Sequence, residues 1–272
     1  MGIEVKDSGS VLYQRALQLG AQGAFNDCVM YLAEAAKQGV AEAQYLYARH
    51  AYDGMVIPKN YTLAVKWFRK ASEQGCKEAT YYLSMCYENG YGGLKKNKTE
   101  AFEYKKKAAE QGHTESQLFV VKHYLSEYGG LNRSNATSYL QMLVAKGVLE
   151  AEYYMGTFYY EGVGVAKDNE KGLQMLRNAA EKGYDESWYY LSRIYYEGIG
   201  MPKNKEEAAK CYRVLADKGD SRAQCLLGKM YEKGDGIPQD KGEAAKWYAK
   251  AIAGGNRYAQ ERMDSWSMRK YR

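Results

Sequence analysis

The sequence predicts an all-α fold: a right-handed α-solenoid, or superhelix, of stacked helix-turn-helix repeats of about 36 residues. Three observations predict it. One glycine recurs at a nearly constant interval, similar residues precede each recurrence, and each interval holds two stretches with helical spacing of apolar residues. The intervals are 36, 37, 35, 36, 36 and 36 residues, between Gly39, Gly75, Gly112, Gly147, Gly183, Gly219 and Gly255.

The first helix of each repeat is predicted from a stripe of side chains spaced four and eight residues apart. A small residue is followed four places on by a larger apolar residue and eight places on by an aromatic one, as in Ala79, Leu83 and Tyr87. This spacing puts the three on one helical face, where the small residue lets a neighbouring helix approach. A glycine loop, such as that at 198–201, then turns the chain.

The second helix is predicted between a capping residue and the recurring glycine. Asn60, Asp168, Asn204 and Asp240 follow the loops and suit helix N-caps. The phrase Ala-Glu-Lys-Gly at 180–183 is typical of a helix C-terminus, because glycine adopts the left-handed conformation without a Cβ penalty. A two-helix unit cannot bury both of its faces alone, so we expect the units to stack on their neighbours.

Composition agrees with a helical chain and excludes other classes. Of 272 residues, 46% are hydrophobic, 26% are charged and only 3 are Pro, which excludes a disordered or collagen-like chain. The formal charge of +6 is too small and too interspersed for a nucleic-acid footprint. No apolar run approaches the ~20 residues of a membrane helix, and the first residues lack a secretory signal. We therefore expect a soluble chain, either cytoplasmic or exported with its signal removed, and leave its localisation open.

These motifs resemble the Sel1-like repeat family, a relative of the tetratricopeptide repeats. Residues 151–165 with Asp168, and residues 234–251, carry the resemblance. It implies a capping helix pair at 1–40 and a capping helix at 256–272. Between them it implies six repeats, at 41–75, 76–112, 113–147, 148–183, 184–219 and 220–255. The repeat at 113–147 departs from the pattern, since it is one residue short and lacks the Gly-x-Gly loop.

Candidate binding residues lie two, six and nine places after the small residue of the first helix, on a face distinct from the packing stripe. In superhelices of this kind the first helices line the concave side, so this face predicts a groove for an extended peptide or a partner's helix. The alternative is that these side chains pack between repeats. This alternative is strongest for the tyrosines at the second place and weakest for the arginines at the sixth place and the tyrosines at the ninth. The candidates are Tyr45, Arg49, Tyr52, Tyr81, Tyr153, Tyr160, Tyr189, Arg193 and Tyr196.

Catalysis finds little support in the sequence. The three histidines, His50, His113 and His123, have no nucleophile at a spacing that the repeat would bring together. The glycine loops lack the Lys-Ser/Thr ending of a phosphate-binding loop. Five cysteines form no C-x-x-C pair, although Cys211 and Cys225 could lie on adjacent helices. We therefore expect no catalytic residue, no metal and no cofactor.

A basic cluster stands out in the second predicted repeat. Aromatic residues for base stacking are not interleaved with its lysines, so we expect a solvated outer face rather than a nucleic-acid site. The cluster consists of Lys95, Lys96, Lys98, Lys105, Lys106 and Lys107.

The sequence favours a monomeric, non-enzymatic scaffold that binds a protein or peptide partner along the concave tyrosine-rich face. The family resemblance implies adaptor roles in bacterial signalling, envelope or host-interaction assemblies, and in eukaryotic membrane-protein quality control. One alternative is an immunity or inhibitor protein that wraps a cognate toxin. The other is a weak β-lactam hydrolase, as linked to a cysteine-rich secreted branch of the family, whose cysteine pair in each repeat this chain lacks.

Overall fold

The computed structural model describes residues 7–126 and 132–269, which form fifteen helices and no strand. Nearly every helix has 13 residues, as expected for repeats of one size. The helices are α1 (Gly9–Ala21), α2 (Phe25–Lys37), α3 (Ala41–Asp53), α4 (Tyr61–Glu73), α5 (Lys77–Asn89), α6 (Lys98–Glu110), α7 (Thr114–Leu125), α8 (Arg133–Ala145), α9 (Leu149–Glu161), α10 (Asn169–Glu181), α11 (Asp185–Glu197), α12 (Lys205–Asp217), α13 (Ser221–Lys233), α14 (Lys241–Ala253) and α15 (Arg257–Arg269).

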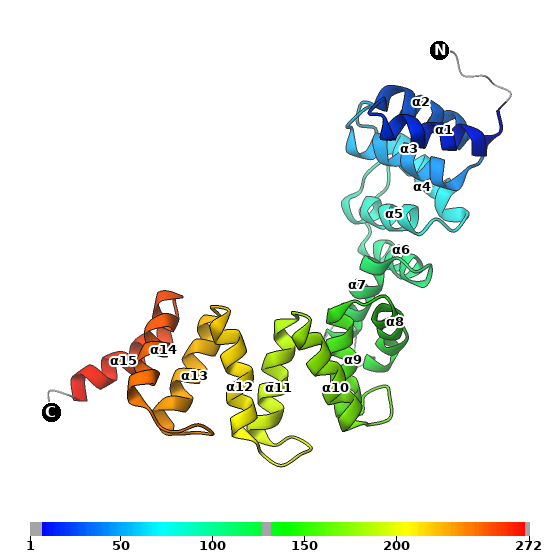
Figure 1. Ribbon diagram of the computed structural model, residues 1–272. Coiled ribbons are helices and arrows are strands. Elements are labelled where there is room, and N and C mark those ends of the chain that lie inside the picture. The colour runs from blue at the N-terminus through cyan, green and yellow to red at the C-terminus, as the bar shows by residue number, and fades with distance from the viewer. Residues whose placement is uncertain (1–6, 127–131, 270–272) are drawn as a thin grey trace. The chain divides into compact units, whose positions relative to one another are not determined.

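The chain divides into two compact units, residues 1–132 and residues 133–272. In the first unit, α1 packs on α2, α3 on α4 and α5 on α6, and each pair contacts the next (Figure 1). The second unit repeats this arrangement with the pairs α9–α10, α11–α12 and α13–α14. The division falls inside the predicted repeat at 113–147, the one without a Gly-x-Gly loop.

Helix ends follow the signals in the sequence. The side chains of Asn60, Asp168, Asn204 and Asp240 accept hydrogen bonds from backbone N–H groups in the first turns of α4, α10, α12 and α14. The seven recurring glycines have φ values between 74° and 105°, in the left-handed region that ends a helix. Both kinds of cap are therefore confirmed as predicted.

Buried polar side chains link successive helices. Gln44, Gln117 and Gln224 each lie one place after the small residue of a first helix, and each is almost fully buried. Each donates from Nε2 to the carbonyl oxygen eight residues earlier, at 3.1 Å. Because an unpaired buried amide costs free energy, these bonds fix each first helix against the second helix before it.

Where a repeat has a glycine loop, the loop packs on the repeat before it. Gly236 has a φ of 80°, and a Cβ at this position would lie 2.5 Å from the carbonyl oxygen of Lys205, at the start of α12. A Cβ on Gly92 would likewise lie 2.5 Å from the carbonyl oxygen of Tyr61. Only glycine allows the loop backbone to lie this close to the preceding second helix.

A carboxylate holds the C-terminal helix α15. Glu232 of α13 accepts hydrogen bonds from the hydroxyl of Tyr248, the guanidinium of Arg262 and the indole nitrogen of Trp266. Burial alone would raise the pKa of Glu232, but these bonds outweigh burial and hold the pKa below its usual value.

We expect α15 to detach at acid pH. A carboxyl with a lowered pKa in the folded state stabilises that state above its unfolded pKa, about 4.3, and the contribution is lost as pH falls through the folded value. The hydrogen-exchange protection factors of residues 257–266, which correct for the pH dependence of the intrinsic rate, should therefore fall more than those of α11 as the pH is lowered below about 4.3. A Glu232→Gln variant should lack this selective loss of protection, and an equal loss in both helices would contradict the assignment.

Candidate functional site

The predicted binding residues lie on the first helices, and those in each unit form a separate group. We call the candidates on α3 and α5 the first tyrosine face, and the candidates on α9 and α11, together with Tyr190 of α11 and Arg222 of α13, the second tyrosine face. In the first, Tyr52 contacts the rings of Tyr61 and Tyr82, both at 5.3 Å. Tyr45 lies 6.0 Å from Tyr82. Burial raises the pKa of both candidate tyrosines, which therefore remain protonated at neutral pH.

Arg49 lies at the edge of the first tyrosine face. Its Nε donates to the carboxylate of Asp53 at 3.3 Å, and its guanidinium carbon lies 6.0 Å from the centre of the Tyr82 ring. The side chain is 51% exposed, so its remaining N–H groups reach solvent. Arg49, Asp53 and the exposed Met55 border a small hollow of about 240 Å³.

Tyr81, on the other side of α5, stacks on the imidazole of His113 with ring centres 4.5 Å apart. His113 is the N-cap of α7, so this contact joins two repeats of the first unit. Burial and the neighbouring Glu115 raise the pKa of Tyr81. This candidate contributes to inter-repeat packing, as the alternative interpretation expected.

Three tyrosines of α11 form the centre of the second tyrosine face. Each hydroxyl donates to a carboxylate of a neighbouring repeat at 2.6 Å: Tyr189 to Asp220, Tyr190 to Glu161 and Tyr196 to Asp235. Hydrogen bonding to an ionised carboxylate is stronger than bonding between neutral groups, so these rings are held in place. Tyr153 of α9 adds a ring contact to Tyr190 at 6.0 Å.

A cation covers each of the three α11 rings. The guanidinium carbon of Arg222 lies 5.0 Å from the Tyr189 ring centre, that of Arg193 lies 4.8 Å from Tyr190, and the ammonium of Lys205 lies 5.1 Å from Tyr196. Lys205 also pairs with Asp235 at 2.5 Å. Arg193 and Arg222 are exposed and pair with no carboxylate among the described residues. Their guanidinium groups are therefore oriented by the rings and still able to bind an acceptor.

Tyr160 needs a correction. The sequence interpretation placed it among the residues that owe least to packing, but its side chain is 2% exposed and its hydroxyl donates to the carbonyl of Ile199. The cause is the close approach of α9 and α10 where glycines face each other. A Cβ on Gly172 would lie 2.8 Å from the carbonyl oxygen of Gly156 and 2.9 Å from the backbone nitrogen of Tyr160. Tyr160 is a core residue and is left out of the second tyrosine face.

The sequence reasoning missed the residue three places after the small one. Tyr82 and Tyr190 occupy this place, one residue after candidates. Tyr82 contacts the rings of Tyr45, Tyr52 and Phe68, and Tyr190 donates to Glu161 and lies under Arg193. The signal was present as the doublets Tyr81-Tyr82 and Tyr189-Tyr190. Arg222 was also missed, because it precedes the small residue of its helix.

The lysine cluster is not uniformly a solvated face. Lys105 is 8% exposed, and its ammonium pairs with Glu88 at 2.8 Å and lies 4.2 Å from the Phe119 ring centre. Its aliphatic chain packs between helices, so Lys105 belongs to the interior of the first unit. Lys95, Lys96, Lys98 and Lys107 are exposed, as expected for a polar surface.

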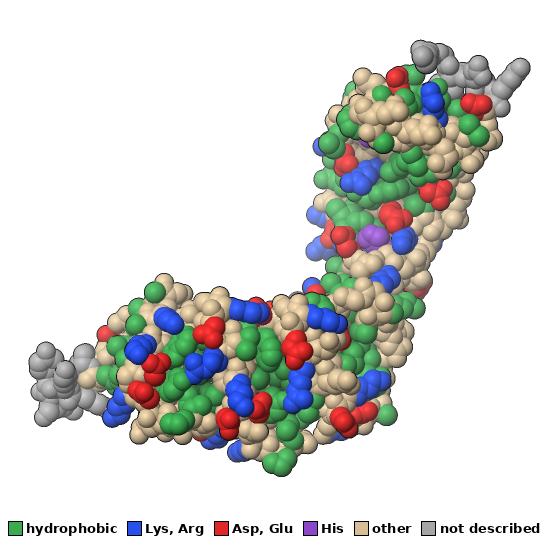
Figure 2. All heavy atoms as spheres, viewed as in Figure 1, with side chains coloured by type: hydrophobic (Ala, Val, Ile, Leu, Met, Phe, Trp, Pro, Cys, Tyr) green, Lys and Arg blue, Asp and Glu red, His purple; other side chains and the backbone are tan. Residues whose placement is uncertain are grey.

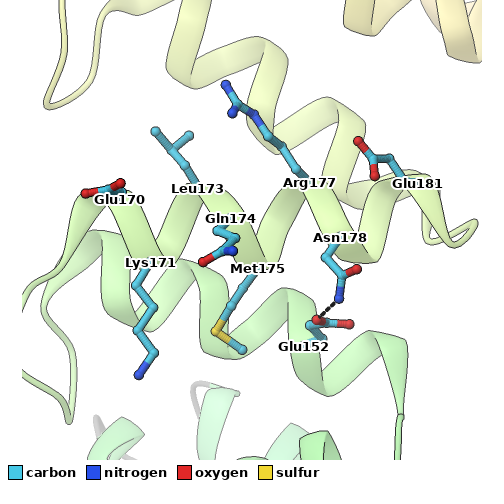
Figure 3. Close-up of a pocket in the computed structure, with 9 residues that line it drawn as sticks. All are labelled: Glu152, Glu170, Lys171, Leu173, Gln174, Met175, Arg177, Asn178 and Glu181. Carbon is cyan, nitrogen blue, oxygen red and sulfur yellow. Dashed lines mark hydrogen bonds between the residues drawn. The ribbon is translucent and has the colours of Figure 1, made fainter.

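A larger hollow of about 800 Å³ lies along α10 (Figure 3). Lys171, Met175 and Asn178 point to one side of the helix, where Asn178 donates to Glu152 of α9. Arg177 points to the opposite side and donates to the Tyr195 hydroxyl at 3.1 Å. The sequence analysis did not predict this hollow, because its lining is mostly ordinary polar residues of a second helix.

The described part of the chain holds neither a metal-binding cluster nor a disulfide. No cluster of three or more His, Cys, Asp or Glu side chains there could hold a metal ion. All five cysteines are free thiols, Cys211 and Cys225 included. Burial raises the pKa of Cys86 and of Cys211 to about 12, which leaves almost no thiolate at neutral pH.

This burial predicts the pattern of thiol labelling. Cys76 is half-buried, whereas Cys28, Cys86, Cys211 and Cys225 are buried. At pH 8, a disulfide reagent should react with no more than one thiol per chain within minutes and with all five after denaturation in urea. Rapid reaction of two or more thiols in the folded protein would contradict the assigned burial.

Across residues 7–126 and 132–269, no helix is both long and apolar enough to cross a bilayer.

The family model described as the Sel1 repeat matches five segments of the chain: residues 41–76, 77–113, 149–184, 187–220 and 221–256. Together they cover more than half of the chain. Residues 114–148, where the sequence departs from the repeat pattern and where the two units divide, lie between the matched segments.

Solved structures share the fold. The chain is similar to the protective antigen c5321 of uropathogenic Escherichia coli, described as displaying an SLR fold, with 26% identity and a TM-score of 0.76. That match covers 96% of this chain and 57% of the antigen, so this chain spans little more than half of the antigen's length. A Sel1 repeat protein from Oxalobacter formigenes matches with 22% identity and a TM-score of 0.53, over 97% of this chain and 95% of that chain. The predicted α-solenoid of helix-turn-helix repeats is confirmed.

Immunity protein Pa5087 of Pseudomonas aeruginosa also matches, with 22% identity over 78% of this chain and 81% of that chain, but a TM-score of 0.41 is too low to bear on function. No curated protein matches the chain. The five matched repeats confirm the resemblance that the glycine loops and second helices indicated. The chain belongs to the Sel1 repeat family.

Proposed function

We propose that the protein is a monomeric, non-enzymatic scaffold that binds a segment of a protein partner on its second tyrosine face. Sel1 repeat proteins commonly serve as protein-interaction scaffolds, and this role needs no catalytic group. The observation that carries the assignment is the pair Arg193 and Arg222, each stacked on a tyrosine ring and neither paired with a carboxylate among the described residues.

Ring-stacked arginines suit partner binding for an energetic reason. A free arginine side chain loses rotamer entropy when a partner immobilises it, whereas Arg193 and Arg222 are already held over Tyr190 and Tyr189. The rings are themselves fixed by Glu161 and Asp220. Tyrosine and arginine are also the side chains most enriched at binding hot spots.

The charge distribution favours a protein partner over nucleic acid. Basic and acidic side chains are interspersed on the visible surface of each unit, with hydrophobic side chains between them (Figure 2). Exposed acidic residues, Glu186 and Glu197, lie on α11 itself. A continuous phosphate backbone would be repelled by these carboxylates, whereas a peptide can place its charges individually.

The assignment predicts a loss of affinity without a loss of stability. Arg193→Ala and Arg222→Ala should each weaken partner binding by about 1–3 kcal/mol, the usual effect of truncating a hot spot, and leave the Tm nearly unchanged. Partners captured on the immobilised full chain would be identified by mass spectrometry and then titrated by calorimetry against the purified variants.

Arg213→Ala is the matched control. Arg213 of α12 is also exposed and also stacks on a tyrosine, Tyr231, at 5.6 Å, but it lies on a second helix. The Arg213→Ala variant should bind the partner with the same affinity as the unaltered chain. If Arg213→Ala weakens binding while Arg193→Ala and Arg222→Ala do not, the binding surface is on the second helices. A toxin as the captured partner would make the protein an immunity protein.

A further inference from the structure

The first helices of the second unit change the sign of their charge along the chain. Helix α9 carries three acidic side chains and no basic one, and α11 carries three acidic side chains and one basic one. Helix α13 reverses this balance, with one acidic side chain and three basic ones. The end of the second tyrosine face that lies on α13 is therefore positively charged.

Arg222 makes the largest change to the repeat pattern. The residue directly before the small residue of a first helix is glutamate in five repeats, at Glu42, Glu78, Glu115, Glu150 and Glu186. In α13 the same place holds Arg222, which is exposed and stacks on the ring of Tyr189. Lys233, at the other end of α13, likewise stands where α3, α9 and α11 end in a carboxylate. Because glutamate fits the first of these places in five repeats, packing does not require the arginine.

Two cations border the ring of Tyr189. Arg222 stacks on it, and Arg193 lies one helical turn beyond Tyr189 on the same side of α11. Lys229 holds the place of Arg193 one repeat later, and it too pairs with no carboxylate among the described residues. The carboxylate of Asp220 is already engaged, since it accepts from the Tyr189 hydroxyl at 2.6 Å and from a backbone N–H at the start of α13 at 2.7 Å. The positive charge of this region is therefore left for a group from outside the chain.

Arg49 of the first unit provides a contrast. It holds the same place on α3 as Arg193 does on α11, and it pairs at 3.3 Å with Asp53, four residues on. Arg193 also has an acidic residue four places on, Glu197, but its guanidinium lies over the Tyr190 ring instead. A guanidinium held in this way keeps a planar set of N–H donors that matches a carboxylate.

An exposed acidic side chain lies on the other side of α11. Glu186 acts toward α9, where it adds to the effect of burial in raising the pKa of Tyr153. A nucleic acid, with a charge at every step, would cross both regions, whereas a protein segment can place its carboxylates over α13 alone. Resting on the proposed function, we infer that the partner segment is acidic where it crosses from α11 to α13, and that its Asp or Glu side chains bind Arg193 and Arg222.

Arginine Nε–H signals of the full-length ¹⁵N-labelled protein test this inference. The probe is a capped tetrapeptide of glutamate, titrated at constant ionic strength and about pH 6, where its carboxyls are ionised. The signals of Arg193 and Arg222 should shift and saturate at millimolar probe, because exposed ion pairs give weak affinity. A capped tetrapeptide of glutamine, which has the same length and no charge, should leave both signals in place.

Two variants of Arg222 measure the contribution of charge. Arg222→Glu introduces the residue that five other repeats carry at this place, so it is compatible with the fold. It should weaken binding of the glutamate probe about tenfold, read from the Arg193 signal, because it removes an attraction and adds a repulsion. Arg222→Ala removes the attraction alone and should weaken binding about threefold.

Arg49→Ala is the matched control, because Arg49 holds the same place in its helix as Arg193 but is paired with Asp53. The Arg49→Ala variant should bind the glutamate probe with unchanged affinity. The signal of Arg213, which is exposed and ring-stacked on a second helix, should not move during the titration.

Three results would overturn the inference. Equal shifts with the glutamine peptide would mean recognition without charge, and an equal shift of the Arg213 signal would mean a general attraction of anions. Tighter binding of a tetrathymidylate strand at Arg193 and Arg222 would replace the protein segment by a nucleic acid.

Failure of this inference and failure of the proposed function give different results. If the glutamate probe causes no shift but a captured partner loses affinity with Arg222→Ala, the second tyrosine face binds a partner and the acidic chemistry is wrong. If the probe binds at Arg193 and Arg222 but neither alanine variant affects the captured partner, the acidic site stands and the proposed binding of that partner on this face is wrong.

Discussion

Gly236→Ala is expected to destabilise the second unit by about 3–5 kcal/mol. The backbone at this position has a φ of 80°, which an L-residue adopts only with strain. The added methyl group would also lie 2.5 Å from both the carbonyl carbon and the carbonyl oxygen of Lys205, so the loop must move away from α12. Strain and overpacking each cost about 1–3 kcal/mol, and they act together here. Urea denaturation followed by circular dichroism would measure the effect.

Gly219→Ala separates the two contributions. Gly219 has a similar φ, 94°, but a Cβ there would meet nothing within 4 Å. Its substitution should cost about 1 kcal/mol, the strain alone. If the two variants unfold at the same urea concentration, the contact between the loop and the preceding second helix contributes nothing to stability.

The sequence predicted the repeat because the same local problems recur in every unit. Each second helix needs a left-handed residue to end it, and each first helix needs a small residue where its neighbour crosses. Ala43, Ala79, Ser187 and Ala223 are all fully buried, as that requirement demands. Local chemistry repeated at a fixed interval therefore determines both the helix ends and the stacking.

The candidate face was only partly predictable, because helical spacing gives the direction of a side chain but not the distance to the next helix. Tyr160 and Tyr196 hold the same place in successive repeats, yet Tyr160 is buried and Tyr196 is half-exposed. Gly156 and Gly172 let α9 and α10 approach closely, whereas the next pair of helices carries a serine and an alanine at these places. The acceptors Glu161, Asp220 and Asp235 were not predictable either, since each lies 29 to 39 residues from its tyrosine.

The division into two units has a partial signal in the sequence. The repeat at 113–147 lacks the loop whose second glycine lies against the preceding second helix elsewhere, as Gly92 and Gly236 show. The structure places the division in this repeat, after Asn132. The hollow along α10 left no such signal, because it depends on side chains that one repeat alone carries.

Tyr160→Ala is expected to destabilise the second unit by about 3–5 kcal/mol, the usual cost of truncating a fully buried aromatic residue. Its ring packs with Leu176, Leu191 and Ile194, and its hydroxyl binds the carbonyl of Ile199, so the substitution leaves both a cavity and an unpaired acceptor. Tyr160→Phe should cost about 1 kcal/mol, because only the hydrogen bond is lost. Tyr196→Ala, at the same place one repeat later, should cost less than Tyr160→Ala and should weaken partner binding. The urea midpoints of the three variants and calorimetric titration of Tyr196→Ala provide the measurements. A Tyr160→Ala protein as stable as Tyr196→Ala would place Tyr160 back on the second tyrosine face.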